Sequence, residues 1–213
     1  MRGETMGSLR PLMNLASELP PQFFDALNFA IDHCHQITRR WPVPHFPAFF
    51  HAEQMGIDSL KLGLNQAAVE AAIVHDLPLM TDVTFSDLES VVSQETVDLI
   101  HEWTPPSHVL QNTELFNIDE HLIMLSRSNA TVQTLVFLDL VQTAPNVGNH
   151  QLDIAEQFAD LLKTYERALQ QIHPKLMARA EFIEKWLRSR VYEKQVAEYK
   201  DEKAEIEYIR PRG

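Results

Sequence analysis

The stretch Ala71-Ala72-Ile73-Val74-His75-Asp76-Leu77-Pro78-Leu79 places a histidine and an aspartate inside an otherwise apolar run. Burying a carboxylate is costly unless the charge is paired or bound to a metal ion. Imidazole and carboxylate groups together suit divalent metal ions. We therefore predict that His75 and Asp76 help to hold a metal ion in the interior.

A second carboxylate interrupts an apolar run further along the chain. Asp139 lies within Thr134-Leu135-Val136-Phe137-Leu138-Asp139-Leu140-Val141. Two isolated carboxylates in two apolar helical stretches are typical of one shared site. The sequence predicts that Asp139 joins His75 and Asp76 at a buried metal centre.

The surrounding pattern predicts an all-α chain. The sequence has only 6 glycines, and apolar residues recur with the 3.6-residue period of a helix over most of its length. The expected helices run from Pro21 to about Arg40, over 48–61, from Asn65 to Pro78, from Ser86, from Ser93 to Thr104, from about Asp119, from Asn129 to just before Pro145, and over about 151–171 and 175–200.

Asparagine and serine residues mark several expected helix starts. Asn65, Ser93 and Asn129 precede apolar-periodic segments and can accept a hydrogen bond from a backbone N–H of the first turn. Ser86 and Glu89 have the three-residue spacing of a capping box. The segment 41–47 contains three prolines, so it is expected to be non-helical.

Composition limits the classes of partner. The 213 residues include 18 basic and 30 acidic side chains, a net charge of -12, which argues against nucleic acid. The single cysteine, Cys34, suits a reducing compartment and is expected in the core rather than as a nucleophile. The N-terminus lacks a hydrophobic signal core, and no apolar run approaches about 18 residues. We expect a cytoplasmic protein that does not bind membranes.

The order and spacing of the candidate ligands resemble the H…HD…D signature of the HD superfamily of metal-dependent phosphohydrolases. His51 precedes His75 by 24 residues (75 − 51), and Thr81-Asp82-Val83-Thr84 follows the His75-Asp76 pair. Within the superfamily, the chain is most similar to the hydrolase domain of RelA/SpoT-type enzymes, which remove the 3′-pyrophosphate of (p)ppGpp. The likeness is strongest over 48–104 and 130–143.

This resemblance implies a fold, a cofactor and a set of site residues. The fold is an all-α HD-domain helical bundle, with 1–213 as a single domain: a lead-in over 1–19, an HD core over 20–145, and C-terminal helices over 146–213 packed on it. One divalent ion is bound, Mn²⁺ in the first place, with Fe, Ni, Co or Mg as alternatives. The ligands implied are His51, His75, Asp76 and Asp139. Asp76 is also assigned the catalytic role, and Arg39 and Arg40 bind the substrate.

The chain departs from the family pattern where chemistry and recognition are concerned. The family has a Glu-Asp pair where this chain has Leu79 and Met80, which can neither transfer a proton nor orient water. Leu140 stands in place of an arginine, and Thr143 in place of an asparagine. Arg39 and Arg40 lie 12 and 11 residues before His51, rather than about nine. Glu53, Glu70 and Glu102 are candidate substitutes for the missing acids, and the sequence does not choose among them.

Two function classes remain open. The first is a phosphohydrolase acting on a nucleotide phosphate or pyrophosphate, with altered activity toward alarmones. The second is a catalytically degenerate, metal-binding pseudoenzyme that binds a nucleotide or a protein. A small phosphorylated ligand is the expected partner, and a homodimer is left open.

Several residues have more than one interpretation at this stage. A two-metal variant would require His101 or His121 as a ligand, although these and His108 are expected on the surface. His45 would be the first ligand only if the register were shifted. Trp41 and Trp103 are either base-stacking or core residues.

Overall fold

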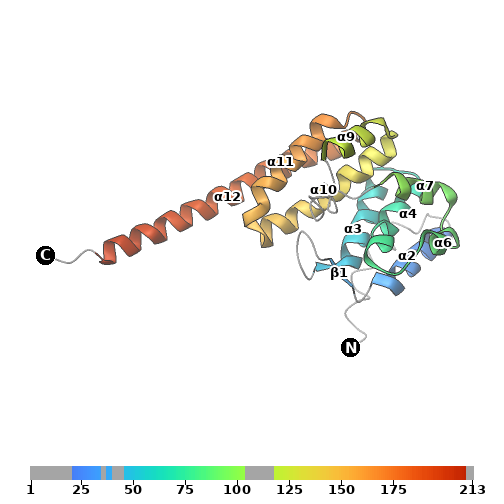
Figure 1. Ribbon diagram of the computed structural model, residues 1–213, viewed down its shortest axis with the longest axis horizontal. Coiled ribbons are helices and arrows are strands. Elements are labelled where there is room, and N and C mark those ends of the chain that lie inside the picture. The colour runs from blue at the N-terminus through green and yellow to red at the C-terminus, as the bar shows by residue number, and fades with distance from the viewer. Residues whose placement is uncertain (1–20, 35–36, 40–45, 104–117, 210–213) are drawn as a thin grey trace.

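The computed structural model describes residues 21–34, 37–39, 46–103 and 118–209, and nearly all of them are helical (Figure 1). The all-α prediction is confirmed. The helices are α2 (Pro21–Cys34), α3 (Ala48–Lys61), α4 (Gln66–Val74), α5 (Leu77–Met80), α6 (Phe85–Glu89), α7 (Gln94–Glu102), α9 (Ile118–Arg127), α10 (Ala130–His150), α11 (Leu152–Ala168) and α12 (Pro174–Ile209).

A short strand pair brackets the proline-rich segment. Strand β1 (Thr38–Arg39) pairs in antiparallel fashion with β2 (Phe46–Pro47). The first helix therefore ends at Cys34, six residues before the end expected near Arg40 (40 − 34), because the chain turns to extended backbone at Thr38. The expected lead-in, 1–19, lies outside the described residues.

Three of the predicted caps are confirmed. The Asn65 side chain accepts a hydrogen bond from the N–H of Ala68, and the Asn129 side chain accepts one from the N–H of Val132, each at 3.0 Å. The Ser93 side chain caps α7. The capping box at Ser86 and Glu89 is wrong. Thr84 and Asp87 form the box instead, because that register buries Leu88 completely.

Two prolines behave differently from the sequence prediction. The helix that leads to His75 ends at Val74, and Pro78 lies in the first turn of α5, where its missing N–H leaves no bond unmade. Helix α10 continues through Pro145 to His150. Its buried residues Val141, Ala144 and Val147 lie on both sides of the proline, so side-chain packing outweighs one lost backbone hydrogen bond.

Helix α10 is the centre of the core. It contacts α3 and α4 on one side and α9, α11 and α12 on the other (Figure 1). Its buried residues include a continuous run from Val132 to Val141. A residue in the middle of this run, such as Asp139, lies where the two groups of helices meet.

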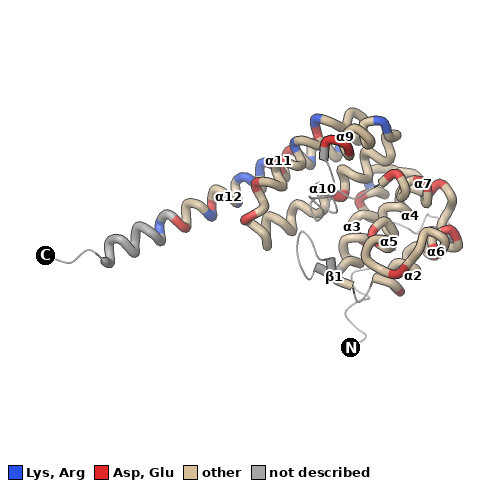
Figure 2. Tube along the Cα trace, viewed as in Figure 1, with Lys and Arg blue, Asp and Glu red and all other residues tan. Residues whose placement is uncertain are grey.

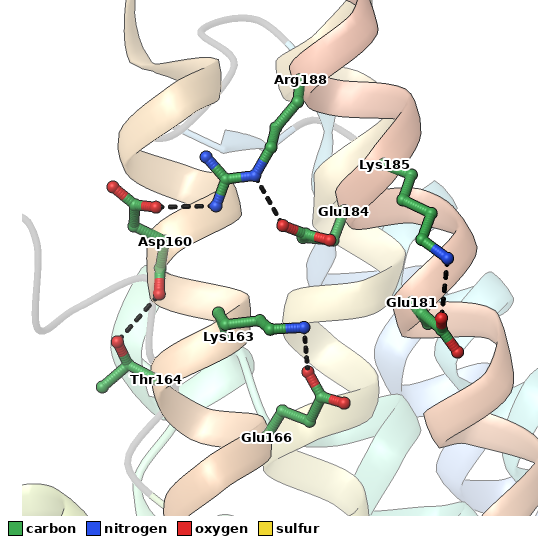
Figure 3. A network of polar contacts seen from close by, with 8 residues as sticks. All are labelled: Asp160, Lys163, Thr164, Glu166, Glu181, Glu184, Lys185 and Arg188. Atoms are coloured by element: carbon green, nitrogen blue, oxygen red, sulfur yellow. Dashed lines mark hydrogen bonds and ion pairs between the residues drawn. The ribbon is translucent and has the colours of Figure 1, made fainter.

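The C-terminal pair α11 and α12 pack along α10, and the far end of α12 extends beyond the bundle (Figure 1). A Cβ atom at Gly148 would come within 2.9 Å of the Leu187 side chain and closer still to Trp186, so only glycine allows this approach of α10 and α12. Figure 3 shows exposed ion pairs on the outer face, such as Arg188 with Asp160. Such pairs contribute little to stability. Among the described residues, no helix combines the length and apolar character that crossing a lipid bilayer requires.

Asp58 joins three helices at one carboxylate. It lies on α3 and is 7% exposed, and its Oδ2 accepts from Gln142 of α10 and from Arg179 of α12. Lys61 approaches Oδ1 at 3.4 Å. The carboxylate therefore connects the site-bearing helices α3 and α10 to the C-terminal helix.

We expect Asp58→Ala to lower the free energy of unfolding by about 1–3 kcal/mol, because it removes hydrogen bonds to a charged acceptor and leaves Gln142 without that partner. Urea titration followed by circular dichroism measures the change. The matched control is Asp160→Ala, an exposed carboxylate on α11 that should cost less than about 1 kcal/mol. Equal effects of the two substitutions would contradict the assignment of Asp58 as a junction.

Candidate metal centre

Four residues of the predicted site come from three separate parts of the fold. His51 lies in the first turn of α3, His75 and Asp76 lie in the turn between α4 and α5, and Asp139 lies in the middle of α10. All four are at most 2% exposed. The end of α4 at Val74 turns His75 and Asp76 toward the same interior region as His51.

The side chains converge. One ligand atom each from His51, His75 and Asp76 lies within 4.8 Å of the others, and Asp139 Oδ1 lies 2.9 Å from His51 Nε2. Around an octahedral ion with bonds of about 2.1 Å, adjacent ligand atoms are about 3 Å apart and opposite ones about 4 Å. The donor set of imidazoles and carboxylates and its spacing therefore fit a divalent cation.

A backbone carbonyl fixes the protonation of His75. The Nδ1 atom lies 2.9 Å from the carbonyl oxygen of Ala72, which can only accept, so Nδ1 carries the proton. In the neutral ring, the lone pair is then on Nε2, which lies 3.3 Å from Asp76 Oδ1. The indole of Trp103 stacks on the imidazole at 4.1 Å between ring centroids. This arrangement is typical of a metal-binding histidine whose second nitrogen is held by a neighbouring acceptor.

Asp139 is oriented by residues that the sequence did not mark for this role. The Thr143 hydroxyl, one turn along α10, donates to Asp139 Oδ1 at 3.4 Å. Tyr165 of α11 is fully buried, and burial and then the nearby Asp139 charge raise the pKa of its phenol above the usual range. Its hydroxyl lies 2.8 Å from Nδ1 of the buried His121. The hydrogen-bonded pair Tyr165 and His121 therefore lies near enough to Asp139 for its charge to act on the phenol, and only the fold brings these residues together.

Cys34 is a core residue, as expected. It is 1% exposed, and burial together with the Asp76 charge raises the pKa of the thiol to about 12. The thiol therefore stays protonated near neutral pH and is not a nucleophile.

The protein around the site is strongly acidic. Residues 46–103 contain ten acidic residues and one basic residue, Lys61. Figure 2 shows the contrast with α11 and α12, where most of the basic residues of the described chain lie. The negative electrostatic field of these residues attracts a cation and repels a polyphosphate that carries no bound metal ion.

Leu79 and Met80 line hollows on the surface, and the one that reaches His75 is lined by Leu79. Leu79 is 48% exposed and lies between two hollows. One is a cavity of about 250 Å³ that also touches His75. The other, of about 780 Å³, is lined by Met80 and by acidic residues that include Asp82. In neither hollow does this pair offer a group that can transfer a proton.

None of the three candidate substitute acids is positioned at the cluster. Glu70 accepts hydrogen bonds from Gln66 at 2.6 Å and from Thr96 at 2.8 Å. Glu102 is exposed on α7. Glu53 follows His51 by two positions, so its side chain leaves α3 about 200° around the helix, away from His51.

The remaining candidates fall in different places. Arg39 belongs to β1, while Arg40, Trp41, His45 and His108 lie outside the described residues. His101 is exposed, as expected, but His121 is 2% exposed, so its assignment to the surface is wrong. Its turn of α9 packs against α11, where Tyr165 provides a partner for the imidazole. Within the described residues, neither histidine belongs to the group formed by His51, His75 and Asp76.

The burial of Glu53 can be tested through the pH dependence of the protein's stability. The side chain is 2% exposed, and burial raises the pKa of its carboxyl from 4.5 to about 7. Between about pH 4.5 and about pH 7 the Glu53 carboxyl is protonated in the folded protein but ionised in the unfolded chain. The free energy of unfolding therefore falls as the pH rises through this range. We expect Glu53→Gln to raise the urea midpoint at pH 8 and to change it much less at pH 5, with EDTA present. A gain of equal size at both pH values would contradict this assignment.

Comparisons with known proteins support the architecture. No protein-family model matches the chain, and no curated protein matches it significantly. Among solved structures, it is similar to the one described as "A metazoan ortholog of SpoT hydrolyzes ppGpp and plays a role in starvation responses". The TM-score is 0.65 at 17% sequence identity, covering 77% of this chain and 94% of the other. A likeness at this identity concerns the fold, and it confirms the predicted all-α HD-domain bundle.

Proposed function

We propose that the protein is an HD-type metal-dependent phosphohydrolase that acts on a nucleotide phosphate. The observation that carries this proposal is the convergence of ligand atoms from His51, His75 and Asp76 within 4.8 Å, with Asp139 against His51. A cluster of this composition in the core of an HD fold is expensive to bury without a cation. The similar solved structure, whose description states that the protein hydrolyzes ppGpp, supports the same class of chemistry.

One divalent ion would be held by His51, His75, Asp76 and Asp139, with Mn²⁺ proposed first and Fe, Ni, Co or Mg as alternatives. Imidazole and carboxylate ligands in an open arrangement suit these ions better than they suit a closed zinc site. When bound, such an ion supplies a Lewis acid for a phosphate oxygen and lowers the pKa of a bound water.

The chain's own groups have defined tasks in this proposal. The Ala72 carbonyl holds the proton of His75 on Nδ1, so that Nε2 faces the cluster. Thr143 donates to Asp139 and limits the rotation of its carboxylate. The catalytic role proposed for Asp76 is that its carboxylate accepts a proton from the attacking water. The buried setting excludes bulk water and strengthens each of these interactions.

The apolar pair Leu79 and Met80 supports altered rather than standard alarmone hydrolysis. General acid–base groups typically contribute about 10²–10⁴-fold in rate. Because neither residue can transfer a proton, we propose slow turnover of (p)ppGpp or a preference for another nucleotide phosphate.

A second candidate is a metal-stabilised pseudoenzyme that binds a nucleotide without turnover. Two observations favour it: the exposed Leu79 at the edge of the site, and the absence of Glu53, Glu70 and Glu102 from the cluster among the described residues. This candidate differs from the enzyme in a measurable way, since ligand would raise the melting temperature while no product forms.

Metal-dependent phosphate release tests the enzyme. We expect the Mn²⁺-loaded protein to release phosphate or pyrophosphate from at least one member of a panel of nucleoside mono-, di- and triphosphates and (p)ppGpp. Asp139→Asn should reduce the rate by at least about 100-fold, because it removes a charged ligand. Colorimetric phosphate detection, with pyrophosphatase added where needed, measures both.

The control for this experiment is Asp160→Asn, which changes an exposed carboxylate on α11 and should leave the rate unchanged. Ligand-induced stabilisation without release, from protein shown to contain the metal, would select the pseudoenzyme. Release that persists in Asp139→Asn would reject the proposed centre.

Thr143 gives an independent test of the ligand arrangement. We expect Thr143→Val to weaken Mn²⁺ binding by about 10–100-fold, the usual effect of removing a partner of a metal ligand. Isothermal titration calorimetry measures the affinity. Thr134→Val is the matched control on the same helix, because the Thr134 hydroxyl accepts from His173 at 3.3 Å and has a structural role. Equal Mn²⁺ affinities in the two variants would contradict the role of Thr143.

A further inference from the structure

The cavity next to His75 has walls suited to a planar ring. Its volume is about 250 Å³, below the range of about 300–1,000 Å³ typical of pockets for whole drug-sized ligands. A cavity of about 150 Å³ is large enough for benzene. The space therefore suits one aromatic ring system. Its lining consists of His75, Pro78, Leu79, Phe85, Ile100, His101 and Trp103.

Two stacked pairs of rings build much of this wall. The rings of Trp103 and His75 are 4.1 Å apart at an interplanar angle of 14°, and those of Phe85 and His101 are 3.9 Å apart at 15°. These contacts hold four rings in fixed orientations before any ligand binds. Preformed aromatic surfaces of this kind are where planar groups stack.

Trp103 supplies a buried hydrogen-bond donor beside the cavity. The residue is 3% exposed, and its Nε1 makes no hydrogen bond within the described part of the structure. An unsatisfied buried donor typically costs about 1–3 kcal/mol, and buried indole N–H groups usually have a partner. An acceptor on a ligand in the cavity would satisfy it.

The cavity is also unsuited to a phosphate group. Within the described part of the chain its lining contains no lysine or arginine, and Leu79 and Pro78 are apolar. A second phosphate at this position would lose its hydration without gaining a cationic partner, which is costly. A neutral ring loses little and gains apolar contact.

We propose that this cavity is a subsite for the base of a nucleotide whose phosphate lies at the metal cluster. The inference rests on the proposed function and narrows it: the substrate would be a nucleoside phosphomonoester rather than a compound with a pyrophosphate on this side. The family that this chain resembles has an acid at the position of Leu79. In this proposal, the apolar Leu79 side chain favours an aromatic base over a charged group.

Binding measurements separate the ring from the phosphate. The full chain is titrated with adenosine, guanosine and uridine in EDTA, and with AMP, ribose 5-phosphate and pyrophosphate after Mn²⁺ loading, by calorimetry. We expect at least one nucleoside to bind without metal. AMP, or the monophosphate of that nucleoside, should bind at least about tenfold more tightly than ribose 5-phosphate, since stacking of one base contributes about 1–3 kcal/mol.

Two variants locate this binding. Leu79→Trp places a larger side chain at a half-exposed position and should weaken nucleoside binding at least about tenfold by filling the cavity. Trp103→Phe keeps a ring for stacking but removes the N–H, and should weaken binding about fivefold. Phe182→Ala, an exposed apolar residue on α12, is the control and should change nothing. Mn²⁺ affinity should remain unchanged in Leu79→Trp and in Phe182→Ala.

Each outcome bears on one of the two proposals. Equal affinities for AMP and ribose 5-phosphate, or nucleoside binding that Leu79→Trp leaves intact, would overturn the ring subsite while leaving metal-dependent phosphate release to stand. Nucleoside binding that the two variants weaken, together with no phosphate release from any substrate, would keep the subsite and reject the enzyme. If Leu79→Trp fails to fold, the Trp103→Phe titration decides alone.

Discussion

Asp139 and His51 approach each other closely in the protein interior, and this contact sets how the helices around it pack. The two side chains are almost fully buried and 2.9 Å apart, yet the two residues lie 88 positions apart in sequence (139 − 51), on α3 and α10. Keeping these two side chains together requires α3 and α10 to pack side by side. Near the C-terminal end of α3, Asp58 also binds both α10 and α12 through hydrogen bonds. Polar groups buried at such cost specify one arrangement of the helices.

The same constraint explains the surroundings of the cluster. The acidic segment 46–103, with Lys61 as its one basic residue, favours a cation, and the Ala72 carbonyl and Thr143 hydroxyl orient two of the proposed ligands. Beside this polar centre, Leu79, Phe85 and Trp103 line an apolar space. His75 belongs both to the charged centre and to the lining of the neutral, ring-sized cavity. We therefore propose a nucleoside monophosphate, rather than a pyrophosphate compound, as the substrate.

Local chemistry made much of the fold predictable. Asn65, Ser93 and Asn129 cap helices as expected because an N-cap depends on a few consecutive residues. The errors arose where two local solutions compete or where packing overrides propensity. Thr84 and Ser86 both have an acid three residues on, and burial of Leu88 decides between them. Pro145 remains inside α10 because the buried residues around it hold the helix together.

The amino-acid sequence was enough to predict the helical architecture and to mark His75, Asp76 and Asp139 as candidates, because isolated polar residues in apolar helical runs are visible without a structure. His51 was added by the resemblance of the histidine spacing to the H…HD…D signature. The surroundings of these residues could be known only from the folded structure. The burial of His121 against Tyr165, the position of Glu53 on another face of α3, and the stacking of Trp103 on His75 depend on contacts between distant segments. Such contacts are set by the packing of whole helices, which no local pattern of residues encodes.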